Sequence, residues 1–200
     1  MSFQEFIRTA LAVAMVCTGM PALAEGPAAL DIGEPKAILK VVLSEMRSVE
    51  RCGLYPSWAP LSSWAGNKIP AGLARSYLDL DANQDIEPPV PAVGFEAIVD
   101  PGPIGAAAYC DSAAEEAYAK ELAKVDSSGY ASFSTTGFSF PVFNKLHTRA
   151  VVLENEFLLV WRTEGDRVLR SHGEGGGDAV VLEKDHGTWK IIKRVRTWIT

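Results

Sequence analysis

Apolar residues at helical spacing mark the first half of the chain. Between residues 35 and 52 they recur three and four positions apart, which predicts an amphipathic helix, and Gly53 suits its C-terminal cap. Residues 70–80 and 112–125 follow the same period and predict two further helices. Residues 93–99 instead alternate between apolar and other side chains, which predicts a strand before the third helix.

From Ala131 onward the apolar residues recur with a period of two, which is typical of strands. The predicted strands cover residues 138–142, 148–154, 157–163, 168–171, 179–184 and 188–199. The predicted turns lie at residues 144–145, 164–166, 172–177 and 185–187. Successive strands with short polar turns form an antiparallel meander, and helices must cover one of its faces. The sequence therefore predicts an α+β fold, with about three N-terminal helices packed on a C-terminal antiparallel β-meander.

This order of elements is also that of cone-shaped NTF2-like domains, an analogy that rests on topology alone. In that alternative, the curved sheet encloses an apolar pocket for a small ligand or a reaction. The side chains expected to line the pocket are Phe138, Phe140, Val152, Leu159 and Trp161.

The N-terminus has the pattern of a secretory signal peptide. A short polar start with Arg8 precedes an apolar run at residues 10–16, and small residues flank a cleavage site between Ala24 and Glu25. The apolar run is shorter than the roughly 20 residues that span a bilayer, so no membrane span is expected. We therefore expect a periplasmic or secreted protein.

Cleavage there divides the chain into a signal peptide at residues 1–24, a flexible leader at 25–34 and a single α+β domain at 35–200. The net charge of −6 is uneven, because acidic residues concentrate in the first half of the mature chain. Nucleic-acid binding needs clustered cations over much of one face, so nucleic acid is not the expected partner.

Two cysteines, Cys52 and Cys110, remain after cleavage. An oxidising compartment favours a disulfide between an isolated pair, although two free buried thiols are the alternative. The chain-entropy model assigns such a crosslink a stabilisation on the order of 4 kcal/mol. Cys17 raises the alternative of a lipid anchor, but Val16 stands where that signal favours a small residue.

The last third of the chain resembles a group of uncharacterised secreted bacterial proteins. The resemblance rests on the strand Ser139-Phe-Pro-Val-Phe-Asn144 and the hairpin Leu182-Glu-Lys-Asp-His-Gly-Thr-Trp-Lys190, which match S-x-P-V-F-N and L-x-K-x-x-G-x-W-K motifs. These motifs are structural, so the resemblance implies an exported α+β protein and no particular activity.

No metal site is expected. The acidic stretch Asp79–Glu87 has oxygen ligands at alternate positions but lacks the glycine and the final glutamate of a calcium loop, so a solvated turn is expected. The histidines His147, His172 and His186 fall in predicted turns without metal-ligand spacing. The glycine-rich residues 173–177 lack the Lys-Ser/Thr pair of a phosphate loop and predict a flexible connection.

Catalytic patterns are also incomplete. Neither Gly-x-Ser-x-Gly nor Ser-x-x-Lys occurs, and Glu115 and Glu116 are expected on a solvated helix face. The last predicted strand places Lys190, Arg194 and Arg196 on one face with Trp198. That face either attracts an acidic surface or is the ordinary solvent side of the strand.

These observations predict an exported, non-catalytic binding or accessory protein without a cofactor. Its expected partner is another envelope protein or a small apolar ligand. The alternative is a cone-fold carrier or enzyme with an apolar pocket beneath the sheet.

Overall fold

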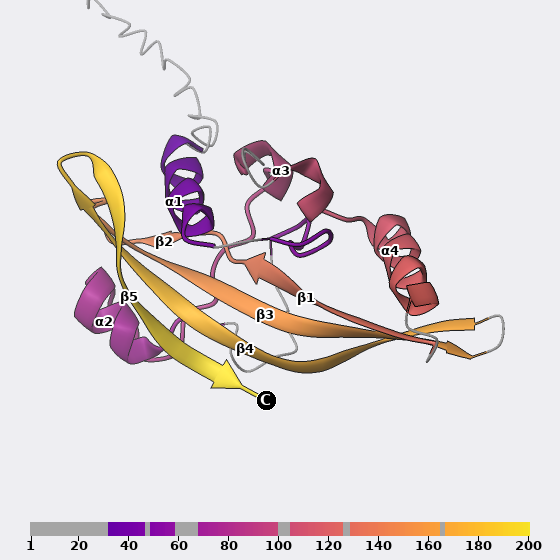
Figure 1. The fold of residues 1–200 in the computed structure, drawn as a ribbon. Coiled ribbons are helices and arrows are strands. Elements are labelled where there is room, and N and C mark those ends of the chain that lie inside the picture. Colours follow the sequence, from indigo (N-terminus) through magenta and orange to yellow (C-terminus); the bar gives the residue numbers. More distant parts are fainter. Residues whose placement is uncertain (1–31, 47–48, 59–67, 100–104, 126–128, 165–166) are drawn as a thin grey trace, which may run out of the picture. The chain divides into compact units, whose positions relative to one another are not determined.

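The computed structural model describes residues 32–46, 49–58, 68–99, 105–125, 129–164 and 167–200, all within the compact unit Asp31–Thr200. Its helices are α1 (Gly33–Ser44), α2 (Ala71–Leu78), α3 (Phe95–Ile98) and α4 (Ser112–Val125), with a 3-10 turn at Ala106–Ala108. Its strands are β1 (Tyr130–Phe138), β2 (Val142–Phe143), β3 (Arg149–Glu164), β4 (Arg167–Asp185) and β5 (Thr188–Ile199) (Figure 1). The predicted α+β class and the antiparallel meander are confirmed.

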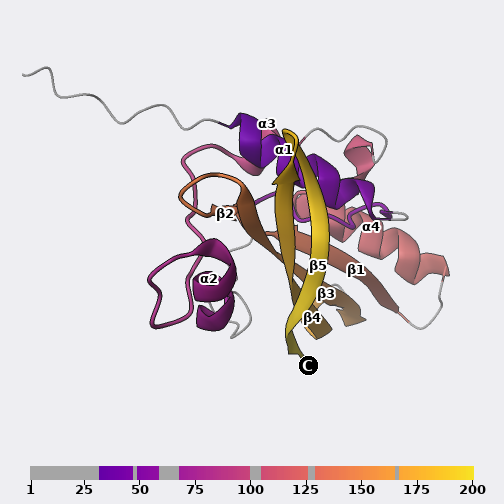
Figure 2. The ribbon, with the colours of Figure 1, turned by 90° about the vertical axis from the view of Figure 1, so that its left-hand side faces the viewer.

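The sheet follows the order β1-β3-β4-β5, and β2 pairs with β3 beside β1. Every pairing between these strands is antiparallel, and Figure 2 shows β3, β4 and β5 side by side. The predicted hairpin turn between β4 and β5 is confirmed. His186 and Gly187 both have positive φ there, as a tight two-residue turn requires. No helix in the part of the chain described above is long and apolar enough to cross a bilayer.

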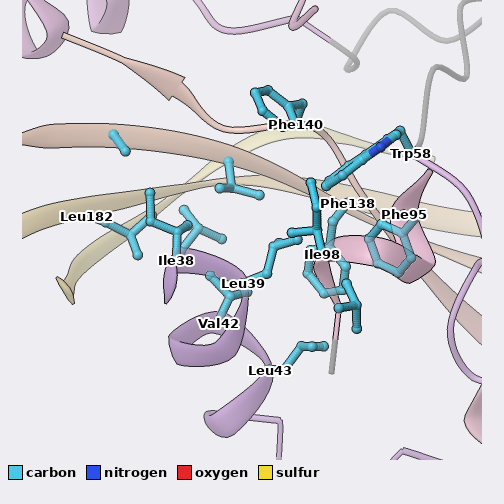
Figure 3. Packing of buried hydrophobic residues seen from close by; sticks show 14 of the residues in the cluster. Ile38, Leu39, Val42, Leu43, Trp58, Phe95, Ile98, Phe138, Phe140 and Leu182 are labelled. Atoms are coloured by element: carbon cyan, nitrogen blue, oxygen red, sulfur yellow. The ribbon is translucent and has the colours of Figure 1, made fainter. Parts of the chain in front are cut away.

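Helices α1 and α2 cover opposite faces of the sheet (Figure 1). Val152 and Val180 pack with α1 and α3, whereas the neighbouring residues Val151 and Val181 pack with α2. We call the two sides of the sheet the α1 face and the α2 face. Figure 3 shows side chains of α1 meeting those of α3 and the strands in the first cluster; the labelled residues are Ile38, Leu39, Val42, Leu43, Trp58, Phe95, Ile98, Phe138, Phe140 and Leu182.

Two element predictions in the first half of the chain are wrong, and the predicted strand 138–142 is instead the end of β1 and the start of β2. Residues 93–99 contain the helical turn α3 rather than a strand, because Phe95 and Ile98, three positions apart, both insert into the core. The first helix ends at Ser44 rather than near Cys52. Cys52 has a positive φ, and its N–H donates to the carbonyl of Ala107 instead of continuing the helix.

The predicted turn at residues 172–177 is also wrong, because this segment lies inside the long strand β4. Gly175, Gly176 and Gly177 pair with β3 at Phe157, Glu156 and Asn155. A Cβ atom at Gly175 would lie 2.6 Å from the carbonyl oxygen of Glu156. The glycines therefore permit close packing of the strands instead of forming a loop.

The predicted disulfide between Cys52 and Cys110 is confirmed, with Cα atoms 4.9 Å apart and a sequence separation of 58 residues. It holds the segment after α1 beside the residues before α4. Directly after Cys52, Gly53 and Tyr55 hydrogen-bond through their backbones to Thr136 of β1. The crosslink therefore anchors a short backbone bridge at the edge of β1.

The glycine segment of β4 provides a stability test. A Cβ atom at residue 177 would lie 2.1 Å from Nε1 of Trp198 and 2.6 Å from Oδ1 of Asn155. These two atoms share a 2.8 Å hydrogen bond. We expect Gly177→Ala to lower the free energy of unfolding by about 1–3 kcal/mol in urea denaturation, through overpacking.

Gly176→Ala is the matched control. The atom nearest its added methyl group is Nη1 of Arg196, at 2.8 Å, and this flexible guanidinium can move. We expect a change within about 0.5 kcal/mol. Equal destabilisation by both substitutions would contradict the packing described for Gly177.

Candidate functional site: an acidic groove on the sheet

The α1 face changes from apolar to charged side chains within two residues along β3 and β4. Val152 of β3 pairs with Val180 of β4, and both are fully buried beneath α1. Two residues further along the same ladder, Glu154 of β3 pairs with Asp178 of β4. Alternation keeps these side chains on the same face. The charged half of that face therefore begins where the apolar cluster under α1 ends.

Two adjoining cavities of about 470 and 270 Å³ lie over this charged half. They share Ser134, Glu154 and Glu156 as lining residues, so we treat them as one groove. The acidic residues that line it are Glu45, Glu50, Glu154, Glu156, Glu174 and Asp178. The basic residues that line it are Arg194 and Arg196. We call this feature the acidic groove.

The two arginines neutralise part of the acidic groove. Arg194 forms an ion pair with Glu154 and a second, at 3.5 Å, with Glu45 just after α1. Burial lowers the pKa of Arg194, but the hydrogen bonds and charges of Glu154 and Glu45 outweigh burial and raise it. Arg196 pairs with Asp178 at 2.7 Å. Arg194 thus ties the end of α1 to the sheet as a permanent cation.

Three carboxylates of the acidic groove remain available. Within the described ranges, Glu50, Glu156 and Glu174 form no ion pair, and all three residues are exposed. They lie on the segment after α1, on β3 and on β4. With six acidic and two basic side chains, the acidic groove carries excess negative charge and attracts cations.

A threonine with little exposed surface also lines the acidic groove. Thr136 is only 7% exposed, and its backbone N–H and carbonyl are paired with Gly53 and Tyr55. Its side-chain hydroxyl has no hydrogen-bond partner among the residues that the structure describes. This hydroxyl is not one of the fully enclosed polar atoms of the described residues, so it is accessible from the acidic groove and can bond to a ligand there.

A second polar cluster joins α4 to the sheet. Arg170 donates from Nε to Glu115 at 2.6 Å and from Nη2 to the hydroxyl of Tyr55 at 3.2 Å. The side chain of Glu115 is only 12% exposed, so the expectation that it is solvated is wrong. Burial and the charge of Arg170 lower the pKa of the neighbouring His172. This cluster positions α4, and its charges already satisfy one another.

The residues singled out for metal binding remain apart. Asp79 pairs with Arg149 at 3.5 Å, and Asp85 accepts a hydrogen bond from the backbone of Ala71 at the start of α2. His147 and His186 lie in turns, whereas His172 lies in β4, contrary to its prediction. In the segments with described coordinates, no three His, Cys, Asp or Glu side chains are grouped to hold a metal ion. Ala24 and Glu25 lie outside the described residues.

The side chains expected to line an apolar pocket are instead packed in the core. They are each at most 7% exposed and belong to the clusters under α1 and α4; the residues are Phe138, Phe140, Val152, Leu159 and Trp161. None of them lines the acidic groove. The interface between the helices and the sheet is therefore filled at these positions.

The predicted basic face of the last strand is wrong. The pairing of β4 with β5 shifts between Val181 and Leu182 and again between Gly177 and Asp178. Each bulge reverses the alternation of side chains. Arg194 and Arg196 consequently point into the acidic groove, whereas Lys190 and Trp198 lie on the α2 face by register. The sequence alone gave no signal for these bulges.

Comparisons with protein-family models, with curated proteins and with solved structures find no match to this chain.

A half-buried carboxylate anchors α1 at the other end of the same face. Glu34 pairs with Lys184 and accepts a 2.6 Å hydrogen bond from Nε1 of Trp189. Burial raises the pKa of Glu34, but the hydrogen bonds from Lys184 and Trp189 outweigh it and hold the pKa below its ordinary value of 4.5. The ionised form is therefore favoured by folding.

This anchor predicts a pH-dependent stability difference. Because folding lowers the pKa of Glu34, its contribution is complete above about pH 4.5 and is lost as the pH falls below it. We expect Glu34→Gln to cost about 1–2 kcal/mol at neutral pH, and the cost to shrink towards pH 3. Urea denaturation followed by tryptophan fluorescence measures this difference. A cost that is constant with pH, or matched by the exposed control Glu87→Gln, would contradict the assignment.

Proposed function

We propose that this chain is an exported, non-catalytic accessory protein that binds a cationic ligand in the acidic groove. The observation that carries the proposal is the convergence on one elongated cavity of three carboxylates, those of Glu50, Glu156 and Glu174, that form no ion pair among the described residues. Carboxylates are acceptor-only groups, so their natural ligands are ammonium and guanidinium groups.

The surroundings of these carboxylates favour binding over catalysis. Two glutamates of the acidic groove, Glu45 and Glu154, form ion pairs with Arg194. The side chain of Glu154 is the less exposed of the two. A carboxylate fixed in this way maintains the shape of the site and is poorly placed to exchange protons with a substrate. The sequence also lacks the nucleophile motifs Gly-x-Ser-x-Gly and Ser-x-x-Lys.

Two features support export to the periplasm or beyond. The Cys52–Cys110 disulfide fits an oxidising compartment, in which such crosslinks persist. The first 24 residues have the order of a signal peptide, with cleavage proposed between Ala24 and Glu25. The resemblance of the C-terminal motifs to uncharacterised secreted bacterial proteins agrees with this location.

Calorimetric titration tests the proposal. The mature chain, with its disulfide intact, is titrated at low salt with spermine and with a capped lysine-serine peptide of equal charge. We expect at least one cation to bind, with an affinity that falls as salt rises, because exposed charges are screened. The variant Glu156→Gln should weaken binding about three- to fivefold, as expected for one exposed charge contact.

Glu87→Gln is the matched control, because it removes the same charge from the loop after α2, outside the acidic groove. We expect it to leave the affinity unchanged. If neither spermine nor the peptide binds at low salt, the proposed function is wrong. Equal weakening by the two variants would show that net charge, and not the acidic groove, attracts the cation.

A further inference from the structure

We infer that the ligand of the acidic groove is an extended polypeptide segment with closely spaced lysine or arginine side chains, supplied by a partner protein. The inference rests on the proposed function and narrows it from any cation to a basic peptide segment. Three observations carry it: the length of the acidic groove, the separation of its unpaired carboxylates and the hydroxyl of Thr136.

The acidic groove runs across the strands. Its lining includes Ser134 of β1, Glu156 of β3, Gly176 of β4 and Arg196 of β5. Neighbouring strands lie about 4.8 Å apart, so four strands span about 14 Å. An extended chain covers that length with about four residues. A single ammonium group would occupy only one part of the acidic groove.

The unpaired carboxylates are distributed along this length. Glu50 lies beside Gly53 at the edge of β1, Glu156 lies on β3, and Glu174 lies in the bulge of β4. The structure's described residues include no cluster of three such groups that could hold one metal ion. Separated carboxylates suit several cations on one ligand, as on a peptide with a basic residue at alternate positions.

Arg194 and Arg196 show which chemistry the acidic groove accepts. Their guanidinium groups already occupy Glu154 and Asp178, and each is held by carboxylate oxygens. The guanidinium group of Arg196 lies over Gly176, which has no side chain. A Cβ atom added at residue 176 would lie only 2.8 Å from Nη1 of Arg196, so the glycine leaves room for this group. The remaining carboxylates can receive the side chains of a partner in the same way.

The hydroxyl of Thr136 distinguishes a peptide from a polyamine. Thr136 as a residue is only 7% exposed and lines the acidic groove, and its hydroxyl is accessible from that groove and has no hydrogen-bond partner in the described part of the chain. A hydroxyl both donates and accepts, and a peptide backbone supplies a carbonyl acceptor as well as an N–H donor. A protonated polyamine supplies donors only, so it leaves the hydroxyl proton unpaired.

The test compares two probes that each carry four positive charges. One is the capped peptide Lys-Ser-Lys-Ser-Lys-Ser-Lys, and the other is spermine. Both are titrated calorimetrically into the mature, disulfide-bonded chain at moderate salt. We expect the peptide to bind at least about tenfold more tightly than spermine, since it alone satisfies the backbone contacts. Thr136→Val should reduce this preference to less than about threefold.

Charge-matched triple variants locate the site. We expect Glu50→Gln, Glu156→Gln and Glu174→Gln together to weaken peptide binding at least about tenfold. Glu87→Gln, Glu116→Gln and Glu164→Gln remove the same charge outside the acidic groove and should change affinity less than about twofold. All three substituted residues of the first set are exposed, and circular dichroism of each variant checks its fold.

Each outcome separates the inference from the proposed function. If spermine binds as tightly as the peptide and the groove variants weaken both, the peptide inference is wrong while cation binding stands. If neither probe binds, both are wrong. If the two triple variants weaken peptide binding equally, the peptide is attracted by net charge and the inference is also wrong.

Discussion

The antiparallel ladder between β3 and β4 is the interaction on which the rest of the structure depends. Its register places Val152 opposite Val180 and, two residues on, Glu154 opposite Asp178. Strict alternation then assigns one face of the sheet to α1 at one end and to the acidic groove at the other. A shift of one residue would turn the carboxylates to the α2 face, where Val151 and Leu153 are buried, which makes the register strongly specified.

Helix α1 is fixed to this ladder by charged contacts at both of its ends. Glu34 at its start meets Lys184 and Trp189, whereas Glu45 after its end meets Arg194. Between these contacts the helix buries an apolar stripe, which supplies most of the adhesion. The ion pairs lie at the two ends of the helix, and the second one lies beside the open part of the face.

The sequence predicted what depends on local pattern. Period-two alternation, the turn at residues 185–187 and the pair Cys52–Cys110 led to the correct class, hairpin and disulfide. Predictions from the sequence were wrong where tertiary packing overrides the local preference of the residues. The glycines near residue 176 resembled a turn, because only the packed strands reveal the close approach of Glu156 and Trp198. The acidic groove was missed because its residues come from separate segments, and two bulges turn Arg194 and Arg196 towards it.

Cation binding to the charged half of the α1 face can be tested residue by residue. Amide chemical-shift mapping of the nitrogen-15-labelled chain, titrated with the lysine-serine peptide, tests it most directly. We expect the largest shifts at Ser134, Glu156 and the amides of residues 174–178, with little change in the loop at residues 79–87. Shifts centred on that acidic loop, or spread evenly over the acidic surface, would contradict it.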